Sequence, residues 1–194
     1  MPQRLSHLQM LSLAVDEYRL DITNDPPHYD DSADNLQSYA RTHSLGDDTY
    51  AATSRHAIRL FQHDQQIRSC LLSAGGGASG VHDHTAIIHG CNCIIAVGPF
   101  MASIAVPTLE LNWSTQADDA TCFGVYESPS HDCLLSHGEL LIARVTHDGT
   151  IVWQASGADI FTNGFELDGD VIHVTDFNDR DYTLDIETGR EIAA

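Results

Sequence analysis

The feature that most constrains the fold is a repeat of about 40 residues in the second half of the chain. The segment LELNWSTQADDATCFGV at 109–125 resembles TIVWQASGADIFTNGF at 150–165. Three pairs of identical residues lie 40 positions apart with no gap: Trp113 and Trp153, Asp119 and Asp159, Gly124 and Gly164. A repeat of this period predicts stacked equivalent units, none of which can bury its apolar face alone.

A third copy lies upstream. QHDQQI at 62–67 matches THDGTI at 146–151, and Gly80 matches Gly164 at the same offset of 84. The units predicted from these matches start near residues 64, 108 and 148.

Within the units, short alternating runs such as CIIAVG, TIVWQA and DVIHVT are separated by DG, HG and TG turn signals. Alternation of this kind predicts half-buried β-strands, and helical periodicity is almost absent. A period near 40 residues with about four strands is typical of one blade of a β-propeller. We therefore expect an all-β fold, a small or partial β-propeller-like array of four-stranded units of about 40 residues.

The segments THDGTIVWQASG and GDVIHVTDFNDRDYTLDIETGREI resemble the repeats of PQQ-like and WD-like propeller proteins. In those repeats a DG-x-φ-φ-W element, where φ is an apolar residue, joins one blade to the next. The pattern over about 62–192 also resembles an uncharacterised group of small bacterial proteins. The resemblance implies architecture and no activity. No WD dipeptide follows a blade, and no quinone ligand is carried over.

We expect a single domain over 1–194. Its predicted parts are N-terminal strands at 1–22, an acidic surface excursion at 21–48, a degenerate blade end at 50–63, and blade-like repeats at 64–107, 108–148 and 149–190.

The composition is strongly acidic, with 28 acidic and 9 basic residues and a formal charge of −19. Such a field repels nucleic-acid phosphates and anionic lipid, so we expect neither as a partner, whereas a basic protein surface is attracted. No apolar run is long enough to cross a bilayer, and the N-terminus lacks the pattern of a signal peptide. Five cysteines without a CxxC motif predict reduced thiols and a cytoplasmic protein.

The stretch VHDHTAIIHGCNC at 81–93 gathers metal-ligand residue types. A hairpin with strands at 81–88 and 93–97 and an HGCN turn would place His82 and His84 about 20 Å from Cys93, at about 3.3 Å per residue. One zinc ion cannot span that distance. We therefore favour no metal and no cofactor, with His82 and His84 as weak metal candidates and a soft-metal pair at Cys91 and Cys93 left open.

The repeated residues predict structural roles. Trp113 and Trp153 are expected to pack between units, with Trp153 largely buried. Asp119 and Asp159 are expected to accept backbone N–H bonds in the loops between units, where Gly124 and Gly164 also repeat. The stretch SAGGGASG is interpreted as a loop of the same class, because a strand-like segment follows it where a nucleotide-binding fingerprint requires a helix.

The leading functional hypothesis is a non-catalytic acidic binding module that recognises a protein partner, with an inhibitor-like role as one form. One alternative is a metal-dependent enzyme that uses His82 and His84. Another is a structural oligomer subunit, such as a homodimer, that buries exposed strand edges. The sequence identifies neither a partner nor a substrate.

Overall fold

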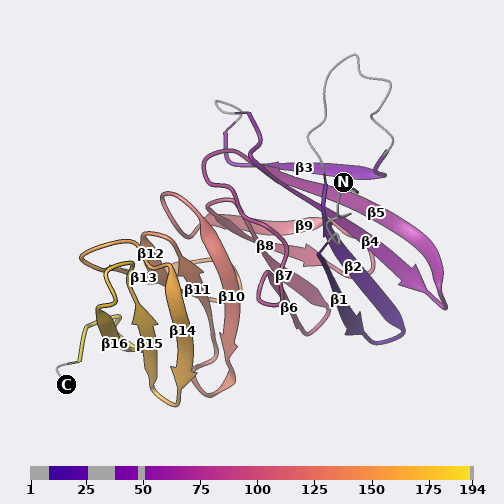
Figure 1. The fold of residues 1–194 in the computed structure, drawn as a ribbon. Helices are drawn as coiled ribbons and strands as arrows, with labels where there is room; N and C mark the ends of the chain where they lie inside the picture. Colours follow the sequence, from indigo (N-terminus) through magenta and orange to yellow (C-terminus); the bar gives the residue numbers. More distant parts are fainter. Residues whose placement is uncertain (1–8, 26–37, 48–50, 193–194) are drawn as a thin grey trace, which may run out of the picture.

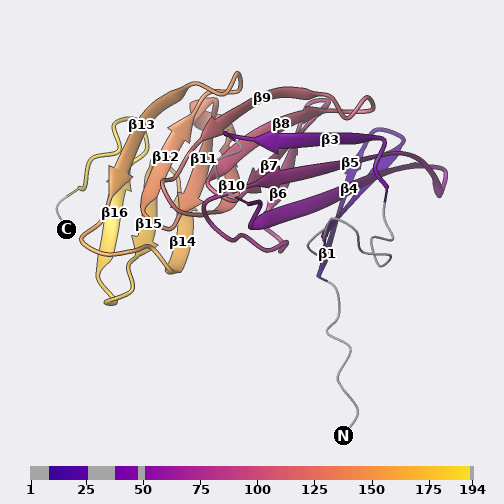
Figure 2. The ribbon, with the colours of Figure 1, turned by 90° about the horizontal axis from the view of Figure 1, so that it is seen from above.

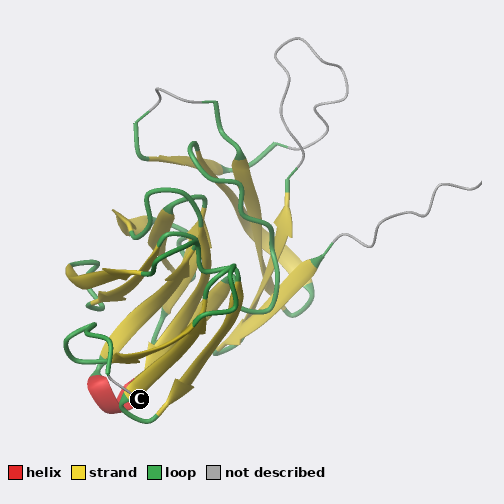
Figure 3. Ribbon diagram, turned by 60° about the vertical axis from the view of Figure 1, so that its left-hand side comes forward, coloured by secondary structure: helices red, strands yellow, loops and turns green. Residues whose placement is uncertain are grey.

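The protein is a partial β-propeller-like array of four β-sheets. The computed structural model describes residues 9–25, 38–47 and 51–192. The helical segment in this part is η1, one turn of 3-10 helix at Pro129–His131, and the other regular elements are strands (Figure 3). The sheets follow one another along the chain and lie side by side in an arc (Figure 1). The all-β prediction is confirmed.

The first sheet has five strands in the order β1-β2-β4-β5-β3. Their bounds are β1 Met10–Val15, β2 Tyr18–Asn24, β3 Arg41–Leu45, β4 Ser54–Gln62 and β5 Gln65–Ala74. Strand β3 pairs with β5 in parallel, although its residues fall in the predicted acidic excursion, where no strand was predicted. Residues 26–37 and 48 of that excursion lie outside the described residues.

The second and third sheets are antiparallel meanders of four strands. The second contains β6 Ala86–His89, β7 Asn92–Val97, β8 Phe100–Ala105 and β9 Leu111–Gln116, and the third contains β10 Cys122–Ser128, β11 Cys133–Gly138, β12 Leu141–Val145 and β13 Ile151–Ser156. Central strands β7 and β8 are almost entirely buried, whereas β9 and β13 alternate between half-buried and exposed positions. This difference matches the continuous apolar run of CIIAV and the alternation in LNWSTQ and IVWQAS.

The predicted HGCN turn is confirmed. His89 pairs with Asn92, and Gly90 between them has a φ of +55°. The predicted strand at 81–88 is wrong in its first half, because β6 begins only at Ala86. The Thr85 N–H bonds the His82 carbonyl at 3.0 Å and the Thr85 hydroxyl accepts from the His82 N–H at 2.8 Å, so residues 82–85 form a turn.

The fourth sheet consists of β14 Asn163–Asp168, β15 Val171–Thr175 and β16 Asp181–Asp185. The boundaries of the sheets are shifted by one strand from the boundaries of the predicted repeat units. The predicted units 108–148 and 149–190 begin with β9 and β13, and each of these strands is the outermost strand of the preceding sheet. Each repeat unit therefore bridges two sheets.

Three apolar clusters form the core, one for each pair of neighbouring sheets. Leu60 and Ile95 lie in the cluster of the first and second sheets, Ala96 and Leu134 in that of the second and third, and Leu135 and Ile172 in that of the third and fourth. Figure 2 shows the same succession of sheets from above. Each sheet thus buries apolar side chains against its neighbours, as expected for a repeat fold.

The two tryptophans lie in equivalent environments. Trp113 Nε1 donates to the His147 carbonyl at 3.0 Å, and Trp153 Nε1 donates to the Ile186 carbonyl at 3.1 Å. A Cβ atom at Gly149 would lie 2.6 Å from Trp113, and one at Gly189 would lie 2.5 Å from Trp153. Each indole therefore packs against a glycine-containing turn of the next sheet. Both indoles are half-buried, less than predicted for Trp153, because the outermost strands face solvent on one side.

Candidate functional sites at the two ends of the sheets

The connections between strands emerge at two opposite ends of the sheets. We call one the loop end; it contains the inter-sheet loops 75–85, 117–121 and 157–162 and the turns 98–99, 139–140 and 176–180. We call the other the hairpin end; it contains the turns 90–91, 129–132, 146–150 and 169–170.

Backbone hydrogen bonds hold the loop end together from one sheet to the next. The N–H groups of Glu139, Phe161 and Phe177 donate to the carbonyls of Thr121, Glu139 and Ile160, respectively, at 2.7–2.8 Å. These bonds place the turns of the third and fourth sheets against the inter-sheet loops. The side chains of Leu140 and Phe177 at these turns point to solvent, whereas Phe161 is buried in the core between the third and fourth sheets.

Buried carboxylates support the loop end: Asp176 accepts the N–H groups of Asn178 and Arg180 in the last turn, and Asp118 lies between the second and third sheets. Asp118 accepts the N–H groups of Ala120, Thr121, Leu140 and Leu141 at 2.6–3.0 Å and has no exposed surface. Burial raises the pKa of Asp118, an effect that the four N–H bonds oppose. The repeat had predicted this role for the neighbouring Asp119, which is exposed and contacts Gln116 at 3.5 Å. Asp159 accepts the Ile160 N–H at 2.8 Å.

The loop end carries acidic and apolar side chains at its surface. A cleft of about 800 Å³ is lined by the glycine loop at Gly76 and Gly77 and by Asp119 and Glu139. A second cleft of about 310 Å³ shares Gly76 and Asp119 with the first. Phe177 is 64% exposed and Leu140 is 37% exposed at the neighbouring turns. We call Asp119, Glu139, Leu140, Asp159, Phe177 and Asp179 the loop-end surface.

The metal candidates His82 and His84 do not form a ligand pair. The Nε2 atom of His82 lies 2.7 Å from the Phe123 carbonyl, and its Nδ1 accepts the His84 N–H at 3.2 Å, so both ring nitrogens are used. The ring of His84 instead stacks on Tyr126, with ring centroids 4.9 Å apart. The structure gives these histidines packing and hydrogen-bonding contacts in place of a metal-binding geometry.

Two buried histidines lie nearby. His56 is fully buried, and His137 is nearly so and stacks on Phe165. Burial lowers the pKa of each to about 4, because the charged imidazolium would lose its hydration. Both are therefore neutral at pH 7.

Gly124 and Gly164 lie at β-bulges at the starts of β10 and β14, where Gly164 is the unpaired residue and Gly124 pairs with His137 directly after the bulge. Gly164 has a φ of +50°, whereas a Cβ atom at Gly124 would lie 3.2 Å from His84. The two glycines thus differ in the reason for having no side chain.

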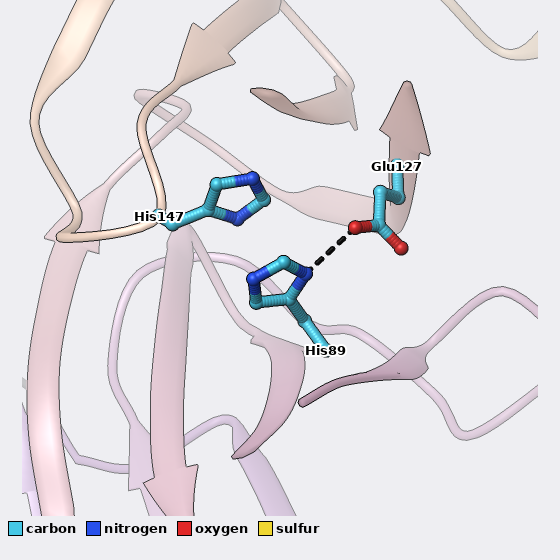
Figure 4. A group of neighbouring side chains, drawn as sticks. All are labelled: His89, Glu127 and His147. Atoms are coloured by element: carbon cyan, nitrogen blue, oxygen red, sulfur yellow. Dashed lines mark hydrogen bonds and ion pairs between the residues drawn. The ribbon is translucent and has the colours of Figure 1, made fainter. Parts of the chain in front are cut away.

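The hairpin end contains a compact cluster that the sequence analysis missed: His89, Glu127 and His147 (Figure 4). His89 ends β6, Glu127 lies in β10, and His147 lies in the turn between β12 and β13, so the cluster joins the second and third sheets. His89 Nδ1 bonds Glu127 Oε1 at 2.7 Å, and the imidazoles of His89 and His147 stack with centroids 3.8 Å apart. Each side chain is about one quarter to one third exposed.

Further carboxylates approach histidines at this end. Asp132 Oδ1 lies 3.2 Å from His147 Nε2, and Asp170 Oδ1 lies 3.2 Å from His131 Nε2. At the hairpin end, side chains therefore bond both side chains and backbone carbonyls, whereas at the loop end backbone N–H groups bond carbonyls across the sheets.

The two cysteines near the HGCN turn differ in exposure. Cys93 is fully buried, and burial raises the pKa of its thiol to about 12, whereas Cys91 is exposed in the adjacent turn. All five cysteines are free, which agrees with the predicted reduced thiols.

Comparison with solved structures supports the fold. A computationally designed protein, Ika4, is 10% identical with a TM-score of 0.57, over 96% of this chain and 99% of that one. The AfRom2 CNH domain is 10% identical with a TM-score of 0.56, over 96% of this chain and 54% of that one. This chain thus spans about half the length of the CNH domain structure. The WD40 β-propeller domain of Doa1 has a TM-score of 0.46 at 13% identity, over 70% and 46% of the two chains.

Comparison of sequences adds no relative. No protein-family model matches the chain, and no curated protein matches it. The similarity to PQQ-like repeats and to small bacterial proteins therefore has no support from sequence relatives. Among the described residues no helix is long and apolar enough to span a bilayer.

Proposed function

We propose that this protein is an acidic, non-catalytic interaction module whose loop end binds a basic segment of a protein partner. The observation that carries the proposal is the exposure of Phe177 and Leu140 beside the carboxylates of Asp119, Glu139 and Asp159. Large apolar side chains that are exposed together and rimmed by polar groups are typical of protein-interaction sites.

Charge and architecture support the same proposal. A net charge of −19 attracts lysine and arginine side chains and speeds encounter with a basic surface. The loops and turns of three successive sheets converge at the loop end, which provides several independent contact points on a rigid scaffold.

The alternative of a metal-dependent enzyme that uses His82 and His84 is not favoured. Both ring nitrogens of His82 contact backbone groups, and His84 stacks on Tyr126. If both imidazoles bound one metal ion, these contacts would have to break.

The proposal is tested with a labelled peptide that alternates lysine and leucine, and fluorescence anisotropy as the measurement. We expect binding that weakens as salt rises, because the attraction is screened. Glu139→Gln and Phe177→Ala should each weaken binding several-fold. Glu166→Gln and Val152→Ala are matched controls, with an exposed carboxylate and an exposed apolar side chain away from the loop-end surface.

Equal losses in the control variants would show that overall charge alone binds the peptide, and the loop-end assignment would then be wrong. Binding of an alternating glutamate–leucine peptide with the same affinity would exclude recognition by charge.

Self-association is a second candidate, favoured by the fourth sheet. Its three strands leave β16 at an edge, where the described chain supplies one bridge, between Leu184 and Glu191. Unpaired strand edges readily pair with another chain. A molar mass that stays at one chain, 21.2 kDa, in light scattering over a concentration series would contradict this candidate.

A further inference from the structure

We propose that the hairpin end carries a binding site for a divalent transition-metal ion, formed by His89, Glu127 and His147. The inference does not depend on the proposed function, because it concerns the opposite end of the sheets. It also differs from the weak candidate pair His82 and His84.

The three side chains come close enough to share one ion. One donor atom from each lies within 4.8 Å of the others. Ligands at about 2.0–2.2 Å from a tetrahedral zinc ion are roughly 3.3 Å from one another. The distance from His89 Nδ1 to Glu127 Oε1, 2.7 Å, is below this value. To bind an ion, the side chains therefore need to move apart or rotate only slightly, and the strands can keep their positions.

His147 presents a nitrogen without a partner. Its Nδ1 atom is buried and has no hydrogen-bond partner among the described residues. Its other nitrogen, Nε2, faces Asp132 Oδ1 at 3.2 Å. A carboxylate at Nε2 favours the tautomer with the proton on that atom, which leaves a lone pair on Nδ1. Histidines that bind metals usually have this carboxylate support on the nitrogen away from the ion.

His89 supplies the second nitrogen. Its Nδ1 already faces the carboxylate of Glu127, so an ion at this position replaces the proton that the two groups share. Proton release makes binding tighter as pH rises. The imidazoles of His89 and His147 are stacked with 9° between their planes, and they must tilt to direct both lone pairs at one ion (Figure 4).

The donor set selects the class of ion. Two imidazoles and one carboxylate suit zinc and neighbouring transition ions, whereas magnesium and calcium prefer oxygen ligands alone. The partial exposure of all three side chains leaves a coordination position open to water. An ion here would cross-link the second sheet, through His89, to the third sheet, through Glu127 and His147.

The test is calorimetric titration of the full chain with Zn²⁺, with the protein purified without a histidine tag and first stripped with a chelator. We expect one ion per chain. His89→Gln and His147→Gln should each remove measurable stoichiometric binding. Asp132→Asn should weaken it by about 10- to 100-fold, as loss of a supporting carboxylate does. The side chain of Asp132 is 94% exposed, so this variant should fold normally.

Two exposed histidines away from the cluster, His84 and His173, provide matched controls. His84→Gln and His173→Gln should leave both stoichiometry and affinity unchanged. Melting temperature should rise with Zn²⁺ in the wild type and rise less in Asp132→Asn. Absence of 1:1 binding in the wild type would overturn the site. Unchanged binding by His89→Gln, or equal losses in the control variants, would overturn it as well.

Discussion

The loop end and the hairpin end of this molecule are closed by different kinds of bond. At the loop end, backbone N–H groups bond carbonyls of the next sheet and the buried carboxylate of Asp118. At the hairpin end, the contacts come from side chains, which bond other side chains, as in His89 with Glu127, or carbonyls, as in Trp113 with His147. Backbone closure leaves surface side chains available for a macromolecule, whereas convergent side chains can hold a small ion.

Loss of the buried carboxylate is expected to have the largest effect on stability. Asp118→Ala leaves four backbone N–H groups without an acceptor, and each unpaired buried group costs about 1–3 kcal/mol. Three of the four bonds are partly buried, so we expect the free energy of unfolding in urea to fall by roughly 4 kcal/mol, toward the lower end of that range. Asp132→Asn at the hairpin end should leave it unchanged, because that side chain is exposed and asparagine tolerates the left-handed backbone at this position. Equal effects would show that the two ends do not differ as described.

The next effect concerns the two tryptophan joints between neighbouring sheets. Trp113→Ala and Trp153→Ala should each cost about 3 kcal/mol, because each removes an indole that packs on a glycine turn. Val152→Ala, at an exposed position beside Trp153, is the control and should have little effect. A loss in only one of the two tryptophan variants, measured by denaturant unfolding, would contradict the equivalence of the joints.

A smaller effect is expected from pH, through the buried histidines. His56 and His137 have pKa values of about 4 in the folded protein and about 6.5 when unfolded. Between these pH values the unfolded chain binds more protons than the folded protein. The contribution of the two histidines to the free energy of unfolding is therefore fully present well above pH 6.5 and is lost as the pH falls toward 4. We expect a loss of about 2 kcal/mol per histidine between pH 6.5 and pH 5.

His137→Phe, which keeps an aromatic ring in the stack, isolates one of these contributions and should halve the loss. Stability that stays constant from pH 6.5 to pH 5 would show that the two histidines titrate normally in the folded protein.

The repeat made the fold predictable. Trp113 and Trp153 occur at one offset because each meets a glycine 36 positions later, and this local rule is visible in the chain. The turn at Gly90 was predictable for the same reason, since its signal lies within four residues. Strand β3 was not, because its pairing with β5 depends on contacts 29 positions away and its own residues are polar.

The candidate site was predicted much less well than the fold. His89 lies in the stretch that first suggested metal chemistry, but Glu127 and His147 are 38 and 58 positions further along. Only the packing of the second sheet on the third brings them together. Sequence reasoning also chose Asp119 over Asp118, because identity across the repeat favoured the exposed residue and burial could not be seen.

One measurement tests the division of roles between the two ends most directly. Backbone amide NMR spectra of one sample are recorded during titration with Zn²⁺ and then with the lysine–leucine peptide. Zinc should shift the amides around His89, Glu127 and His147, and the peptide should shift those around Glu139 and Phe177. Two separate sets of shifted amides are the predicted result. A single set that responds to both ligands, or shifts by either ligand at the opposite end, would contradict the account.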